Sequence, residues 1–236
     1  MNKNYKDLEI TRIKEEYARR EREIPSYFYS LKHPANLYIY TQRIRAMVSL
    51  LNKESLFPLN DKFILDIGCG SGDWLIDFQR WGADQNKLYG VDLLPERIKI
   101  AKKRLPFSDL RIQDASDLPW QDNTFDIVLQ SLVFTSILDN SLKQAIANEM
   151  IRVLKPNGII LWYDFLFNNP KNPNTRGIKA KEIKSLFLNC KIKLKRITLA
   201  PPIVRFLAKY SYFACLLLEN LIFLNTHYLG IIKPNK

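Results

Sequence analysis

The sequence predicts an α/β protein built on a doubly wound, mostly parallel β-sheet. Between residues 61 and 165, short apolar runs alternate with segments of helical periodicity, which is typical of a parallel sheet with helices on both faces. Several of these runs end in an acidic or amide residue, at the strand ends where such sheets bind ligands. With 47% apolar residues among 236, the chain can bury a full core, and its length indicates one large domain or one domain with additions.

The N-terminal part is predicted to be helical. Residues 3–23 mix charges of both signs and indicate a surface helix that ends before Pro25. A second helix is expected from about residue 35 to residue 52, where apolar residues recur at helical spacing. Both helices precede the first strand. We therefore expect a helical addition over residues 1–58 and the main domain over residues 59–236.

A glycine-rich turn follows the first predicted strand. Three glycines stand at alternate positions, Gly68, Gly70 and Gly72, and a helix is expected to begin at Asp73. Glycine lets the backbone turn sharply and approach a ligand closely. The dinucleotide fingerprint would need glycine at position 73, and an acid at that helix start disfavours a pyrophosphate. The flanking acids, Asp66 and Asp73, instead favour a ligand that carries positive charge and no phosphate.

The segment Leu65–Gly72 resembles the first motif of the class I S-adenosylmethionine-dependent methyltransferases, and the segment Arg152–Gly158 resembles the stretch before the fifth strand of that family. The tail resembles bacterial enzymes of the methyltransferase type 11 group. The resemblance covers residues 61–165 and implies a seven-stranded Rossmann-like sheet with S-adenosyl-L-methionine as cofactor. On the first turn it assigns cofactor contacts to Asp66, Gly68, Cys69 and Gly70. A glycine-rich turn of another α/β domain is the alternative.

The second predicted strand, residues 87–92, ends in an acid. Asp92 lies 20 positions after Gly72, a spacing that suits a β-α-β unit whose acid accepts hydrogen bonds from ribose hydroxyls. Leu93, the next residue, is assigned to the cofactor site with it. A helix cap before Pro95 is the alternative role for Asp92, and the two roles are compatible.

The third and fourth strands complete the predicted cofactor site. After the strand at 109–113, the resemblance implies that Asp114 receives the adenine amino group and that Ala115 lies beside the ring. At the end of the strand at 125–130, Gln130 and Ser131 are candidates for the methionine part of the cofactor. All these positions fall at carboxyl ends of parallel strands, so we expect them at one edge of the sheet.

The C-terminal third departs from the expected pattern. A strongly apolar fifth strand at 159–165 precedes a polar loop, a helix at 179–188 and a strand at 192–199. A single apolar helix is expected from about residue 202 to residue 222, inserted between the last two strands, which should form an antiparallel hairpin. The apolar stripe of this helix is expected to be core or a pocket lid, with a membrane-surface role as the sharper alternative.

Methyl transfer from a sulfonium needs an aligned acceptor, and it needs a base only where the acceptor must lose a proton. His33 and Asp164 are the catalytic candidates, and Tyr163 and Arg176 the candidates for substrate binding, Arg176 through an anionic group. The competing role for His33 is structural, and that for Arg176 is simple solvent exposure.

The chain carries a formal net charge of +12. Residues 165–236 hold 13 basic residues and two acidic ones, so the excess is C-terminal. We expect a small-molecule acceptor, anionic or lipid-linked, of glycan, lipid or natural-product type, and peripheral membrane contact is the alternative that the apolar stripe leaves open. A solvated basic surface is an equally weighted explanation of the charge. An RNA methyltransferase is the first rival, although no separate RNA-binding motif is present; a non-catalytic cofactor-binding subunit is the second.

The three cysteines, Cys69, Cys190 and Cys215, are far apart and lack the spacing of metal ligands. They are expected to be reduced, which favours the cytoplasm. The N-terminus is densely charged and does not resemble a signal peptide. The longest apolar stretch, residues 210–224, contains Glu219 and is shorter than a spanning helix needs. No metal is expected.

Overall fold

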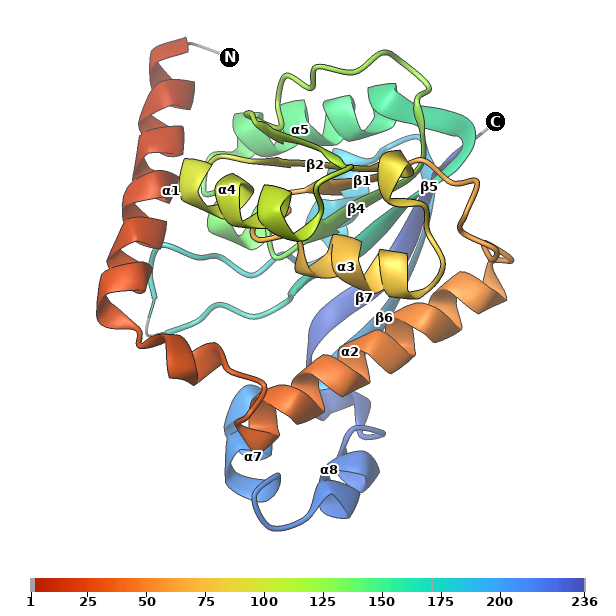
Figure 1. Ribbon diagram of the computed structural model, residues 1–236. Coiled ribbons are helices and arrows are strands. Elements are labelled where there is room, and N and C mark those ends of the chain that lie inside the picture. The colour runs from red at the N-terminus through yellow and green to blue at the C-terminus, as the bar shows by residue number, and fades with distance from the viewer. Residues whose placement is uncertain (1–2, 171, 236) are drawn as a thin grey trace.

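The computed structural model describes residues 3–170 and 172–235, with a seven-stranded sheet at its centre (Figure 1). The strands are arranged in the order β3-β2-β1-β4-β5-β7-β6. The first five are parallel, and β7 is antiparallel to both of its neighbours. The strands are β1 (Ile64–Ile67), β2 (Leu88–Asp92), β3 (Asp109–Ile112), β4 (Phe125–Ser131), β5 (Leu154–Phe165), β6 (Cys190–Leu199) and β7 (Asn225–Pro234). The predicted seven-stranded sheet and its antiparallel end are confirmed.

Helices cover both faces of the sheet, as a doubly wound fold requires. One buried cluster packs α5 and α6 on the first face, and the other packs α2, α3 and α4 on the second. The α-helices are α1 (Lys3–Glu23), α2 (Pro34–Lys53), α3 (Asp73–Arg80), α4 (Pro95–Arg104), α5 (Asn140–Val153), α6 (Ala180–Leu186), α7 (Pro201–Leu207) and α8 (Tyr212–Leu218). Short 3₁₀ turns are η1 (Ser26–Tyr29), η2 (Gln85–Lys87), η3 (Phe134–Ser136) and η4 (Ile222–Leu224).

The central strands are buried on both faces, which explains their unbroken apolar sequences. All four residues of β1 are buried. Along β5, successive side chains alternate between the two clusters: Trp162 lies in the first and Tyr163 in the second. Asp164, the next residue, therefore points to the same face as Trp162.

The predicted single helix of residues 202–222 is wrong in one respect: the structure has two short helices, α7 and α8, and then η4. The break has a local cause. Ser211 adopts an extended conformation, and its hydroxyl accepts a hydrogen bond from the backbone N–H of Ala214 at 3.1 Å, which starts a new helix. The insertion packs on the start of α2 in a third buried cluster, with members Ala35, Tyr38, Leu199, Val204, Ala208 and Cys215.

The insertion begins at the edge of the sheet where the parallel strands end. Because β7 is antiparallel to both β5 and β6, β6 runs in the same direction as β5. Leu199, at the end of β6, pairs with Asn225 at the start of β7. We call this side of the sheet the carboxyl edge. Over residues 3–170 and 172–235, no helix combines the length and the apolar character needed to cross a membrane.

Candidate active site

The glycine loop after β1 has the backbone conformation that its sequence predicts. Gly68, Gly70 and Gly72 have φ angles of +67°, +54° and +82°, in the left-handed region that favours glycine. A Cβ atom at Gly68 would lie 2.6 Å from Cγ2 of Val133, whereas a Cβ atom at Gly70 would meet nothing within 4 Å. The loop is thus packed at Gly68 and faces open space at Gly70, where a ligand can approach the backbone.

Asp92 holds this loop from the end of β2. Its two carboxylate oxygens accept hydrogen bonds from the backbone N–H groups of Gly70 and Leu94, both at 2.9 Å. Burial raises the pKa of Asp92. Each oxygen of a carboxylate has a second acceptor position, so Asp92 can order the loop and still accept two ribose hydroxyls. Next to it, Leu93 is half-buried and packs on the first core cluster.

Several buried polar atoms around β1 and β4 lack a partner. They are Oδ1 of Asp66, Nε2 of Gln130, Nε of Arg43 and Nε1 of Trp74. Buried polar groups are almost always hydrogen-bonded. A ligand with an ammonium and a carboxylate would supply partners to these atoms, and the methionine part of S-adenosylmethionine has both. Together with the space over Gly70, these atoms fit that cofactor.

Electrostatics set Asp66 apart within this group. Burial raises its pKa well above the usual value, and the negative charges of Asp92 and Asp73 add to the shift, whereas the positive charge of Arg43 opposes it. A cationic ligand would favour the ionised form of Asp66. No sequence pattern singles out Arg43, whose guanidinium lies 4.5 Å from the ring centre of Trp74, because the same helix also carries Arg45 and Lys53. Cys69 points into the core, where burial raises the pKa of its thiol.

Asp114, the predicted adenine acceptor, already has a cationic partner. The ammonium of Lys6 lies 2.5 Å from one of its oxygens, and the backbone N–H and hydroxyl of Ser116 donate to the carboxylate at 2.9 and 2.7 Å. Ala115 is half-buried beside it. Lys6 belongs to α1, and nothing in the sequence linked it to Asp114.

Helix α1 lies across the loops that follow the strands at the carboxyl edge (Figure 1). Glu9 accepts from the backbone N–H of Leu138 at 2.5 Å, and Arg12 donates to the carbonyl of Ser136 at 2.7 Å. Glu16 accepts from the side-chain amides of Asn172 and Asn174, both at 2.8 Å. With the pair between Lys6 and Asp114, these contacts join α1 to the loops after β3, β4 and β5.

Asp164 lies at the end of β5 in a fully buried setting. Its oxygens accept from the hydroxyl of Thr135 at 2.7 Å, from the backbone N–H of Thr135 at 3.2 Å and from its own neighbour Phe165 at 2.9 Å. Burial raises the pKa of Asp164 to about 7, against the opposing effect of these hydrogen bonds. A carboxyl group that titrates near neutral pH can take a proton from an acceptor.

The other predicted site residues have different surroundings. The hydroxyl of Tyr163 pairs with that of Thr198 at 2.9 Å, and its ring stacks on His227, so Tyr163 is enclosed on the face opposite to Asp164. His33 is exposed, and its Nδ1 accepts from the backbone N–H of Ala35 at 3.2 Å as the cap of α2. The structure thus gives His33 a structural contact and does not bring it to Asp164.

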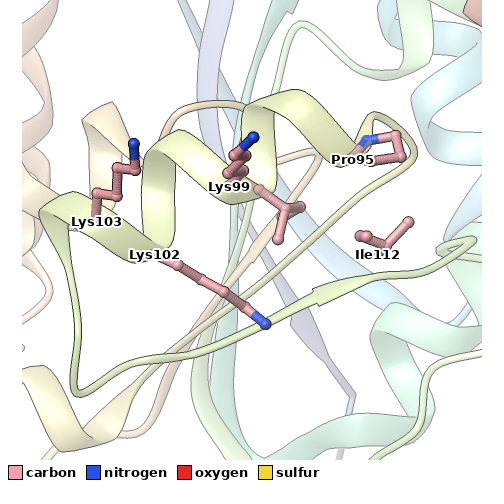
Figure 2. A pocket seen from close by; sticks show the side chains of 6 residues that line it. Pro95, Lys99, Lys102, Lys103 and Ile112 are labelled. Carbon is pink, nitrogen blue, oxygen red and sulfur yellow. The ribbon is translucent and has the colours of Figure 1, made fainter.

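Arg176, a predicted acceptor contact, is linked to Asp164 through Thr135. Its backbone N–H donates to the carbonyl of Thr135, whose hydroxyl donates to Asp164. Its guanidinium donates to Asn140 at 2.9 Å and to Glu182 at 2.8 Å, and these three side chains line a hollow. Figure 2 shows another hollow on α4 and β3, lined by Lys99, Lys102 and Lys103 among others; no residue of the glycine loop lines it.

Comparisons with known proteins agree with this arrangement. Residues 64–158 match the family model for a methyltransferase domain. A sterol 4-C-methyltransferase of Caenorhabditis elegans is 36% identical over 115 residues, which cover 44% of this chain and 31% of the relative. A demethylmenaquinone methyltransferase of Symbiobacterium thermophilum is 34% identical over 101 residues, covering 40% of this chain and 39% of the relative. The aligned segment spans less than half of each of these curated relatives.

Among solved structures, the phosphoethanolamine N-methyltransferase 1 of Haemonchus contortus, in complex with phosphoethanolamine and S-adenosylhomocysteine, superposes with a TM-score of 0.65. It is 15% identical, and the match covers 97% of this chain and 50% of that one. At this identity the likeness establishes the fold. The sheet order, the glycine loop and the family match therefore agree on one class of domain.

Proposed function

We propose that this chain, whose residues 64–158 match a family model for a methyltransferase domain, is a class I S-adenosylmethionine-dependent enzyme that transfers a methyl group to a small-molecule acceptor. The observation that carries the proposal is the glycine loop, held open by Asp92 and bordered by unpartnered buried polar atoms. When bound there, S-adenosylmethionine supplies an electrophilic methyl group on a sulfonium.

The residues of this chain bind and orient in that reaction. Asp92 accepts the ribose hydroxyls, and Asp114 accepts the adenine amino group beside Ala115. Gln130 and Asp66 contact the amino-acid part, with Arg43 near its carboxylate. Positioning of this kind lowers a displacement barrier by several kcal/mol, because the reacting atoms are held in line and water is excluded.

Asp164 is the proposed general base for an acceptor that must lose a proton. Its pKa of about 7 lets it exist as a carboxylate at neutral pH and accept a proton in the reaction. Arg176 is the proposed acceptor contact, through an anionic group at the hollow that it lines. Tyr163, enclosed on the opposite face with its hydroxyl paired to Thr198, is no longer proposed as an acceptor contact. His33 is the second candidate base, since its Nε2 is left free by the contact of Nδ1 with Ala35.

We propose an apolar or lipid-linked acceptor, with an anionic group, and the cytoplasm as the compartment. Two observations support this acceptor class. The relatives reported above are named for a sterol and for demethylmenaquinone, and a largely apolar insertion begins at the carboxyl edge. A cationic acceptor is disfavoured by the basic C-terminal third.

Calorimetry with S-adenosylmethionine tests the cofactor site. We expect Asp92→Ala to weaken binding by about 1–3 kcal/mol, the scale of a lost hydrogen bond to a charged group. Asp61, whose side chain is 80% exposed, provides the matched control, and Asp61→Ala should bind as the wild type does. Unchanged affinity in Asp92→Ala would remove Asp92 from the site. Micromolar binding of NAD or NADP to the wild type would contradict the inference that Asp73, at the start of α3, disfavours a pyrophosphate.

Transfer of a labelled methyl group into a cell extract tests the acceptor class. Label in organic-soluble material or in aqueous small molecules supports the proposal, and the first of these supports an apolar acceptor. Label in RNA would favour the RNA methyltransferase instead. Tight cofactor binding with no labelled product in any fraction would favour a non-catalytic cofactor-binding subunit.

A further inference from the structure

The exposed apolar side chains of this protein are concentrated in one place. We use the name insertion lobe for residues 201–224, which include α7, α8 and η4, together with residues 26–31, which include η1 and lie beside α7 (Figure 1). More than half of the large apolar side chains that are exposed in the described part of the chain belong to it. They are Tyr27, Phe28, Tyr29, Leu31, Phe206, Tyr210, Tyr212, Phe213, Leu216, Leu217, Leu221, Ile222 and Phe223.

Contacts join the parts of the insertion lobe into one surface. The guanidinium of Arg205, on α7, lies 4.5 Å from the ring centre of Phe28, in η1. The hydroxyl of Tyr212, on α8, donates to the carbonyl of Pro34 at 2.7 Å. The segments that begin at residues 26 and 201 therefore lie side by side, and both carry exposed apolar side chains.

The two helices of the insertion lobe have more apolar surface than the fold covers. In α8 only Cys215 is buried, and in α7 only Val204 is, although both helices are apolar on most of their circumference. Phe213 and Phe223 are 69% and 70% exposed. Soluble monomers rarely leave a contiguous patch of this kind uncovered, and such patches mark binding surfaces.

The charges around this surface are positive. Arg205 and Lys209 are exposed on α7 and just after it, and Lys32 follows η1. Among residues 3–170 and 172–235, no carboxylate forms an ion pair with any of the three. The one acid within residues 25–34 and 201–224, Glu219, is turned inward, where the hydroxyl of Tyr38 and the guanidinium of Arg45 donate to it at 2.5 and 3.0 Å.

We infer that the insertion lobe docks on the surface of an anionic lipid bilayer. Aromatic and leucine side chains flanked by lysine and arginine suit the boundary between acyl chains and headgroups, where apolar burial and attraction to anionic lipid act together. A second copy of the chain fits less well, because a twofold contact through this surface would bring the cations of both copies together.

The position of the insertion lobe indicates how docking on a bilayer would serve the proposed reaction. It begins where β6 ends, at the carboxyl edge that also holds the glycine loop. Docking would thus place the candidate active site next to the bilayer, where a lipid-linked acceptor is found. This role rests on the proposed function, but docking itself does not require cofactor or acceptor and is measured without either.

Flotation of the full chain with vesicles tests the inference. The probes are vesicles of phosphatidylcholine alone and of phosphatidylcholine with 30 mol% phosphatidylglycerol, the latter at low and at high salt. We expect binding to the mixed vesicles that falls with salt. Arg205→Glu with Lys209→Glu should reduce that binding about tenfold or more, from about fivefold for each cation. Phe213→Ser with Phe223→Ser should reduce it at both salt concentrations.

Matched variants control for charge and for apolarity. Lys99→Glu with Lys103→Glu changes the net charge equally on α4, and Leu188→Ser removes an apolar side chain that is 81% exposed elsewhere; both should bind as the wild type does. Binding of S-adenosylmethionine in calorimetry shows that a variant is folded. Absence of S-adenosylmethionine binding by the wild type would count against the proposed function alone. Absence of vesicle binding by the wild type would overturn the inference, as would equal loss in the control variants. A dimer abolished by Phe213→Ser with Phe223→Ser, without vesicle binding, would assign the surface to a second copy.

Discussion

The two halves of the carboxyl edge are built by different means. Around β1 and β2, the edge consists of glycine backbone in left-handed conformations and one carboxylate that holds it. Around β5 and β6, the edge consists of side chains from α1, α2, η3 and the insertion lobe. The first half is local in sequence and the second is assembled from distant segments. Recognition through the backbone therefore leaves a motif, and recognition through assembled side chains does not.

The largest effect is expected in the assembled half. Asp164→Asn should lower the turnover of the acceptor found by labelling about 100-fold or more, since it removes the proposed base. In the wild type, turnover should rise as pH passes through about 7, where Asp164 loses its proton, and the variant should lack this rise. Asp61→Asn, at an exposed carboxylate, is the control. A variant with the same pH profile as the wild type would show that Asp164 has only a structural role.

A substitution at Gly70 tests the local half. Gly70→Ala places a methyl group in the open space over the loop, so we expect cofactor affinity to fall about 5- to 150-fold, the scale of a core clash of 1–3 kcal/mol. Gly82 provides the matched control, because it also has a positive φ, +97°, and nothing within 4 Å of an added Cβ. Gly82→Ala should lose comparable stability and no affinity. Equal affinities for the two variants would mean that no ligand occupies that space.

The titration of Asp164 has a consequence for stability that needs no acceptor. Its pKa is raised from 3.8 to about 7 in the folded state, so the native chain binds more protons than the unfolded chain between pH 4 and 7. The free energy of unfolding contributed by this group therefore falls as pH rises through that window. Between pH 4 and pH 8, the free energy of unfolding of Asp164→Asn, measured in urea relative to that of the wild type, should increase by about 2–4 kcal/mol. A pH-independent difference would contradict the raised pKa.

The smallest effect is expected where the two halves meet. Lys6, on α1, forms an ion pair with the carboxylate of Asp114, the proposed adenine acceptor. Lys6→Ala should therefore raise cofactor affinity about two- to fivefold, the scale of a partly exposed ion pair. Lys14→Ala, at an exposed position of the same helix, should leave the affinity unchanged. A loss of affinity in Lys6→Ala would mean that Lys6 binds the cofactor instead of competing with it.

The sequence predicted most of the sheet and the local half of the site. The alternation of apolar runs with helical segments follows from side-chain periodicity, and the acid at the end of β2 follows from the β-α-β spacing. Both are properties of neighbouring residues. Of the predicted site, the position of Asp92 at the same sheet edge as the glycine turn followed from the β-α-β spacing, whereas its hydrogen bond from Gly70 was not predicted.

The contacts that were missed join segments far apart in the chain. Arg12 and Ser136 are 124 positions apart, and Tyr38 and Glu219 are 181 apart. No periodicity or spacing can link such pairs, because their meeting depends on how whole elements pack. The break between α7 and α8 was missed for a local reason. The apolar residues keep helical spacing across the break, but Ser211 adopts an extended conformation there and starts a new helix.

The course of α1 across the carboxyl edge has a kinetic consequence. A cofactor bound between the glycine loop and Asp114 lies beneath a helix that is tethered through Glu9 and Glu16. If the chain binds S-adenosylmethionine as proposed, exchange of spent for fresh cofactor requires these tethers to break. We therefore expect the lifting of this one helix, rather than the transfer of the methyl group, to limit the rate of successive cycles.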